Sequence, residues 1–226
     1  MNIFSFFHST NIVIHIAAGT IALFLGIIAL STKKGKKIHM KSGRWFLLCL
    51  CIVIATGLLG VFVFGRNTFL LVITVLAGYY GFSGYRALQN KSNEPKRIDI
   101  LVALVSLLAV FFFLYYFKTI GMIWTPVIIY STVGTLLSVI AYDFIRYLIP
   151  RSTYGNLWFY EHMYKMIGAF TALLAAFSGT VFPSYKPYSQ VLPSVFGVLL
   201  QIGFITYYFR KNRSHNQSSA ISALSK

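Results

Sequence analysis

Long runs of apolar residues recur through this chain of 226 residues and decide its fold class. An α-helix needs about 20 consecutive apolar residues to cross the hydrocarbon core of a bilayer, and soluble domains rarely contain such runs. The sequence therefore predicts an all-α, polytopic membrane helix bundle. The seven predicted transmembrane helices are residues 11–31, 45–64, 68–88, 98–117, 122–146, 159–182 and 189–209.

Composition supports a lipid environment. Only 11% of the residues are charged and 57% are hydrophobic, whereas a soluble domain is about 25% charged. These charges are too few to form a polar shell. We expect one membrane domain over residues 1–210 and a polar, Ser-rich, disordered tail over residues 211–226. The N-terminal run lacks the positive segment and cleavage site of a signal peptide, so we expect it to be retained as the first span.

The cationic residues predict the orientation of the bundle. If the seven spans cross the membrane alternately, sixteen of the 20 Lys and Arg residues lie on one side and Arg66, Lys118 and Lys186 on the other, while Lys165 lies inside the sixth span. Segments rich in Lys and Arg stay in the cytoplasm, so the N-terminus is expected outside and the C-terminus inside a bacterial cytoplasmic membrane. No basic groove with interleaved aromatic residues lies elsewhere, which argues against nucleic-acid binding. The sixteen are Lys33, Lys34, Lys36, Lys37, Lys41, Arg44, Arg86, Lys91, Lys96, Arg97, Arg146, Arg151, Arg210, Lys211, Arg213 and Lys226.

Small residues predict which helix faces point into the bundle. Helices approach closely in lipid where Gly, Ala, Ser and Thr lie at the contact. Such residues recur at helical spacing in the first, third and sixth predicted spans. The three faces comprise His15, Gly19, Ala22 and Gly26; Ala77, Gly81 and Tyr85; and Gly168, Ala172, Ala176 and Thr180.

Four charged residues lie in one layer near the cytoplasmic ends of the fifth and sixth spans. Ionisable residues inside membrane spans are costly and usually mark functional sites. Asp143 and Arg146 are spaced i, i+3, and Glu161 and Lys165 are spaced i, i+4, so each helix can also form its own ion pair. Two roles therefore stay open for this layer: a proton or ion relay, and purely structural ion pairs.

Histidines suggest a second kind of site. His39 precedes the second span and His162 opens the sixth from the same side, so the two imidazoles are expected at similar depth. Two histidines on facing helices suit haem b, and with Glu161 and Asp143 they would suit a transition metal. His15 enters from the outside and lies roughly 15–20 Å away in depth, too far to share one ion with them. We expect three further polar residues inside the bundle: His15, Arg44 and Lys165.

Recognisable catalytic motifs are absent from the sequence. It contains no G-x-S-x-G, H-E-x-x-H, P-loop or strand-linked G-x-G-x-x-G pattern, and only four carboxylates. No catalytic residue is assigned, and whether the chain is an enzyme stays open. The first hypothesis is a small haem- or metal-binding redox membrane protein with a His39/His162 site. The alternatives are a proton- or ion-coupled small-solute transporter or channel, and a membrane scaffold without chemistry of its own.

The segment "IHIAAGTIALFLGIIALSTKKGKKIHMKSGRWF" resembles the N-terminal signature of a family of bacterial predicted integral-membrane proteins, a domain of unknown function. The segments "RNTFLLVITVLAGYYGFSGYRAL" and "WFYEHMYKMIGAFTALLAAFSGT" are also similar, so the resemblance spans most of the chain. It implies no activity, but it draws attention to His15, His39 and His162. The expected partner is the lipid bilayer; a protein partner or an oligomer stays open. The signature positions are His15, Gly19, Gly26, Lys34, Gly35, His39, Gly43 and Arg44.

Overall fold

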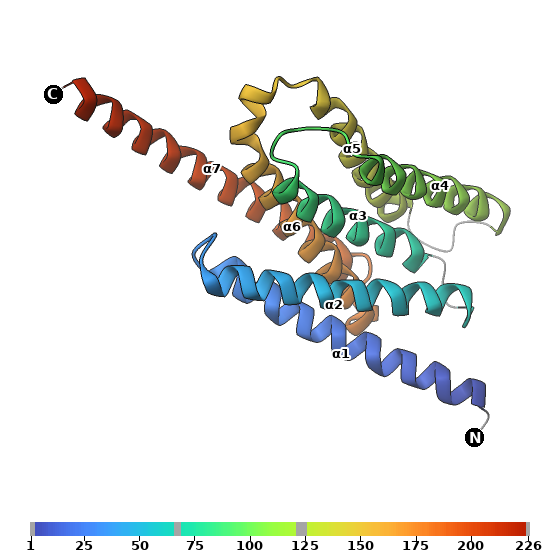
Figure 1. Ribbon diagram of the computed structural model, residues 1–226. Helices are drawn as coiled ribbons and strands as arrows, with labels where there is room; N and C mark the ends of the chain where they lie inside the picture. Colours follow the sequence, from blue (N-terminus) through green and yellow to red (C-terminus); the bar gives the residue numbers. More distant parts are fainter. Residues whose placement is uncertain (1–2, 66–68, 121–125, 225–226) are drawn as a thin grey trace.

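The computed structural model describes residues 3–65, 69–120 and 126–224, and these residues form helices and their connections, without a strand among them (Figure 1). Between its two ends, a helix satisfies its backbone N–H and C=O groups within one segment, which a chain in lipid requires. The seven α-helices are α1 (Ile3–Ser31), α2 (Lys37–Phe62), α3 (Phe69–Gln89), α4 (Arg97–Ile120), α5 (Pro126–Ile145), α6 (Arg151–Val181) and α7 (Tyr188–Leu224). Two short 3₁₀ helices, η1 (Arg146–Leu148) and η2 (Pro183–Tyr185), precede α6 and α7.

Six helices in the described part of the chain are long and apolar enough to cross a bilayer. The expectation of a membrane protein built from several apolar helices is thus confirmed. α3 occupies the predicted span 68–88 but is not among the six, so seven spans and their orientation stay predictions. The six segments are Ile3–Ser31, Lys37–Phe62, Arg97–Thr119, Val127–Leu148, Leu157–Val181 and Tyr188–Arg213.

α3 is the central helix of the bundle. It packs against α6 most extensively and also contacts α2, α4 and α5, while α1 pairs with α2 and α7 with α6. The two termini lie at opposite ends of the molecule (Figure 1). Glycines permit the closest crossings: a Cβ on Gly168 of α6 would lie 2.7 Å from the Tyr80 ring of α3. This tight contact between α3 and α6 positions the charged side chains that α6 carries.

Several predicted boundaries differ from the structure; α1 and α6, for example, each begin eight residues before the predicted first and sixth spans. The residues between the first two predicted spans, 32–44, contain a short connection followed by the start of α2 at Lys37. Gly35 adopts a left-handed conformation with φ of 75°, which ends the turn, and lysines are good helix formers. His39 therefore lies on the first turn of α2.

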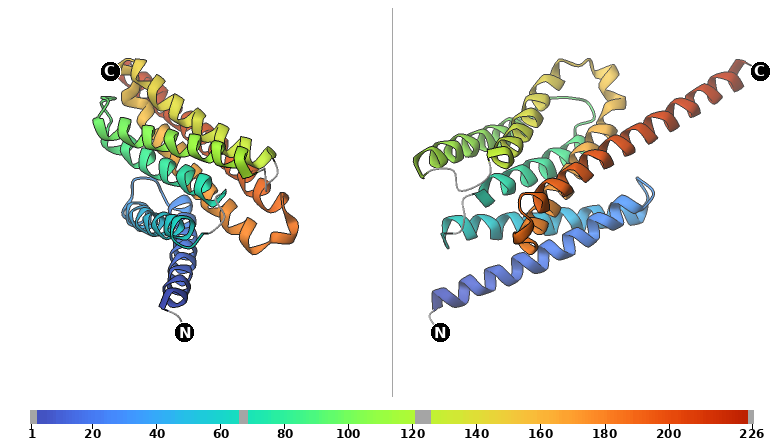
Figure 2. Two further views of the ribbon diagram at one scale, coloured as in Figure 1. Left: turned by 90° about the vertical axis from the view of Figure 1, so that its right-hand side faces the viewer. Right: turned by 180° about the vertical axis from the view of Figure 1, so that it is seen from behind.

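At the other end of the chain, α7 continues as a helix to Leu224, through most of the segment 211–226 for which the sequence predicts disorder. Figure 2 shows the C-terminal part of α7 extending beyond the other helices. No Gly or Pro interrupts the chain between residues 204 and 224, so nothing local ends the helix.

Candidate functional site

Four charged side chains from α5, η1 and α6 form a buried network. The residues are Asp143, Arg146, Glu161 and Lys165, with exposed fractions of 8%, 2%, 5% and 0%. Two of them are acidic and two are basic, so the network is formally neutral. An unpaired charge in such surroundings would be strongly unfavourable, and each member therefore depends on the others.

Contacts of the network lie both within α6 and between α6 and the elements that precede it. Lys165 Nζ donates to Asp143 Oδ1 on α5 and, at 2.5 Å, to Glu161 Oε1 one turn earlier on α6. Arg146 Nη1 donates to both oxygens of Glu161, at 2.8 and 3.0 Å. The pair predicted within the fifth span is looser, with Arg146 Nε 3.6 Å from Asp143 Oδ1. Glu161 and Lys165 do form the predicted i, i+4 pair.

Two tyrosines complete the network, and neither was predicted from the sequence. Tyr79 of α3 donates its hydroxyl proton to Asp143 Oδ2 at 2.8 Å. Tyr154 of α6 donates to Glu161 Oε2 and accepts from Arg146 Nη1. Tyr154 precedes Glu161 by seven residues, a helical spacing that marks a shared face. The sequence contains no comparable spacing for Tyr79, because its contact with Asp143 depends on how α3 is rotated against α5.

The turn between α5 and α6 brings Arg146 back over α6. Pro150 disfavours helical conformation in the preceding residue, and Ile149 is extended, with φ of −76° and ψ of 129°. Asn93 fixes this turn by donating its side-chain amide to the carbonyls of Arg146, at 2.8 Å, and Ile149, at 3.2 Å. The guanidinium of Arg146 is consequently held beside Glu161 of α6.

A small cavity connects the network to a second ion pair. Arg86, near the end of α3, contacts both carboxylate oxygens of Asp99 in the first turn of α4, at 2.6 and 3.0 Å. Ser83 Oγ and Arg146 Nε are buried, and within the described residues neither atom has a hydrogen-bond partner; both residues line the cavity. The cavity volume is about 20 Å³, enough for one water molecule. Asp143, Arg86 and Asp99 also line this cavity.

His39 and His162 make the same kind of hydrogen bond. His39 Nδ1 lies 3.0 Å from the carbonyl oxygen of Ala29, and His162 Nδ1 lies 2.9 Å from that of Gly84. A carbonyl oxygen only accepts, so Nδ1 carries the proton in both rings, and Nε2 of each neutral ring keeps its lone pair. His39 thus bonds to α1 and His162 to α3. The partners of both Nδ1 atoms are backbone carbonyls outside the charged network.

The carboxylates predicted to join the histidines at a metal are used elsewhere. Asp143 and Glu161 bind Lys165 and Arg146, and residues 3–65, 69–120 and 126–224 contain no group of three or more His, Cys, Asp or Glu placed to hold a metal ion. Haem and metal binding stay predictions.

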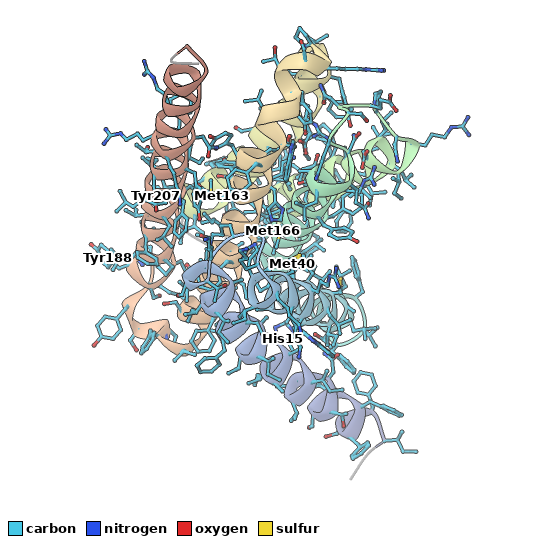
Figure 3. The ribbon with its side chains drawn as sticks, turned by 60° about the vertical axis from the view of Figure 1, so that its left-hand side comes forward. His15, Met40, Met163, Met166, Tyr188 and Tyr207 are labelled. Carbon is cyan, nitrogen blue, oxygen red and sulfur yellow. The ribbon has the colours of Figure 1, made fainter. Side chains whose placement is uncertain are left out.

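The predictions that His15 and Arg44 lie inside the bundle have different outcomes. His15 is partly buried on α1 beside α2 (Figure 3), with Nδ1 2.8 Å from Thr56 Oγ1. Arg44, which we expected inside the bundle, is exposed. The buried face of α2 includes Ser42 and Phe46. Arg44 follows Ser42 by two residues, so its side chain points about 200° around the helix from that of Ser42.

Comparisons with known proteins assign no family. No protein-family model matches the chain, and neither a curated protein nor a solved structure matches it. The resemblance to a family of bacterial integral-membrane proteins stays a prediction.

Proposed function

We propose that this membrane protein moves protons, as a proton-coupled transporter or a proton channel, through a relay of Asp143, Lys165 and Glu161. The observation that carries the proposal is the fully buried ammonium of Lys165, which contacts both carboxylates inside membrane-spanning segments. Charged residues inside the membrane commonly form proton pathways in pumps and transporters. In low-dielectric surroundings, an ion pair and its neutral acid–amine form differ little in free energy. A proton can therefore pass between these groups.

The cavity beside Asp143 supplies a route to the relay. Its polar lining reaches from Asp143 to Asp99 and Arg86, which stand where α3 ends and α4 begins. By the distribution of lysine and arginine, that end faces the cytoplasm. One water bound to Ser83 Oγ and Arg146 Nε would close the gap between the two ion pairs.

Proton flux into vesicles tests the relay. Purified protein is reconstituted with a pH-sensitive dye inside the vesicles, and a potassium diffusion potential drives the flux. We expect the wild-type protein to acidify the lumen and the double variant Asp143→Asn with Lys165→Gln, which keeps the network neutral, to abolish the signal. Glu94→Gln is the matched control, because Glu94 pairs with Arg151 in an exposed position. Flux equal to that of protein-free vesicles would refute a proton channel, and full flux in the double variant would refute the relay.

A second function is favoured by the hydrogen bonds of His39 and His162. Histidines that ligate metals usually donate the other ring N–H to a carbonyl or carboxylate, as both do here. We propose as the alternative that their Nε2 atoms ligate haem b or a transition metal. The carboxylates expected to share the metal are bound to Arg146 and Lys165, which ranks this function second. A Soret band or bound metal that disappears in both His39→Ala and His162→Ala would support it, and colourless, metal-free protein would exclude it.

A further inference from the structure

Three polar residues share one face of α3 and lead from the charged network toward the end of that helix. Tyr79, Ser83 and Arg86 are spaced i, i+4 and i+7, and all three line the small cavity beside the network. Tyr79 bonds to Asp143, and Arg86 bonds to Asp99 of α4. At 1.5 Å per residue, Arg86 lies about 10.5 Å nearer the end of α3 than Tyr79 does. The Arg86–Asp99 pair is therefore nearer the predicted cytoplasmic side than the contact between Tyr79 and Asp143.

The cavity is too small to carry water along this face. α3, α4, α5 and η1 all contribute side chains to its lining. Its volume of about 20 Å³ holds one water molecule. A chain of water molecules over the distance of about 10.5 Å from Tyr79 to Arg86 would need several times that volume. The room for such a chain is occupied in this structure.

Ser83 indicates that the inside of the cavity is suited to water. Hydroxyl groups in these helices usually bond to their own backbone: Ser42, Ser106 and Ser138 each donate to the carbonyl oxygen four residues earlier, at 2.8 or 2.9 Å. Within the described ranges, Ser83 Oγ and Arg146 Nε are buried without a hydrogen-bond partner. Buried polar groups without a partner in the protein are commonly satisfied by water. The interior is therefore polar, although it is narrow.

The Arg86–Asp99 pair ties two helices together where the cavity meets the end of α3. Arg86 Nε and Nη2 donate to the two carboxylate oxygens of Asp99, at 2.6 and 3.0 Å, and Arg86 Nη1 donates to Gln89 at 2.7 Å. Bidentate bonds of this kind are among the strongest and best oriented in proteins. Arg86 lies in the last turn of α3 and Asp99 in the first turn of α4. Separation of these two helix ends requires both bonds to break.

We infer that the Arg86–Asp99 pair is the gate of the cytoplasmic route to the buried network. While the pair is intact, the path of water from the cytoplasm to Asp143 is interrupted. When the pair opens, further water enters along the α3 face and reaches Ser83. The use of this gate in proton transfer rests on the proposed function, whereas its closure to water does not.

The reaction of the variant Ser83→Cys with silver ions tests the gate, because silver ions pass through water-filled openings and bind thiolates. Cys49→Ser and Cys51→Ser first remove the two native cysteines. We expect slow reaction while the pair is intact. Arg86→Ala with Asp99→Ala keeps the net charge and should raise the rate at least about tenfold, since charge-assisted hydrogen bonds hold the gate closed. Arg86→Gln with Asp99→Asn preserves the size of both side chains and should give a smaller increase. The thiol that remains is alkylated after unfolding and counted by mass spectrometry.

Two controls separate a gate from general loosening of the protein. Glu94→Ala with Arg151→Ala removes an exposed ion pair and should leave the rate at Ser83→Cys within about twofold. Ser106→Cys, in the same background, places the thiol at a buried position of α4 outside the cavity lining and should react slowly in every variant. An equal increase in either control would overturn the gate. Fast reaction of Ser83→Cys beside the intact pair, or an unchanged rate in both gate variants, would also overturn it.

Proton flux, measured in the vesicle assay above, distinguishes the gate from the relay. Arg86→Ala with Asp99→Ala should increase the flux, because water then reaches the network more often. A faster thiol reaction in a protein whose wild type carries no flux would refute the relay and support the gate as a barrier to water. A faster thiol reaction with unchanged flux would show that the pair does not lie on the proton route.

Discussion

Replacing Lys165 by Met tests whether the buried network is held together by balanced charge. Methionine keeps a long, flexible apolar side chain but removes the ammonium group that contacts Asp143 and Glu161. Arg146 alone then faces two carboxylates whose exposed fractions are 8% and 5%. Removing one partner from a buried ion pair typically costs about 3–5 kcal/mol. For a chain of this size, a loss of about 4 kcal/mol lowers the melting temperature by roughly 10 °C.

Thermal unfolding of the detergent-purified protein, followed by circular dichroism, measures this loss. The double variant Lys165→Met with Asp143→Asn leaves Glu161 with Arg146 and should recover at least half of the loss, because neighbouring charges are not additive. Arg151→Gln is the surface control and should leave the melting temperature unchanged, since its pair with Glu94 is exposed. A single variant that melts within about 2 °C of wild type, or a double variant less stable than the single one, would refute the balanced network.

Two further predictions concern helix contact and pH. Gly168→Ala places a methyl group 2.7 Å from the rigid, buried Tyr80 ring and should destabilise the protein by about 1–3 kcal/mol in the same melting assay. The control Gly134→Ala adds a methyl group that meets no atom within 4 Å, so it should be neutral or stabilising. Burial of Lys34, in the connection after α1, lowers its pKa from 10.5 to about 8. The unfolded chain then binds more protons between pH 8 and 10.5, so this group's contribution to stability rises with pH across that window. Amine acylation read by mass spectrometry should show a midpoint near pH 8 for Lys34, and a midpoint near 10.5 would contradict the burial.

The sequence predicts the helices better than the contacts between them. Apolar runs locate helices because lipid requires them, and small residues locate part of the inward faces: Ala22 and Ala172 have exposed fractions of 0% and 6%. Tyr85 and Thr180, assigned to the same faces, are exposed. Spacing along a helix gives a face but does not say where a neighbouring helix crosses it.

The same limit explains why the residues of the candidate site could be predicted from the sequence but most of their contacts could not. The charged residues of the network were identified from their position inside predicted spans, together with their pairing along each helix. The bonds of Arg146 to Glu161 and of Lys165 to Asp143 depend on how α5 and α6 are turned toward each other, which one sequence does not encode locally. Ser83 gave no signal at all, because an isolated serine in a membrane helix usually bonds to its own backbone.

The ion pairs that join the spans of α5 and α6 also bear on how the protein enters the membrane. Each of these spans carries one acid and one base, and both are less apolar than α1, α2 and α4. Insertion through a translocon costs about 2.5–3.5 kcal/mol for each Asp, Lys or Arg at the centre of a lone helix, and less for charges nearer its ends, where those of α5 and α6 lie. We infer that α5 and α6 partition into lipid together, as a hairpin whose turn is fixed by Asn93 and Pro150. Glycosylation mapping of a chain truncated after Ile149 should find α5 incompletely inserted, and complete insertion would show that α5 needs no companion.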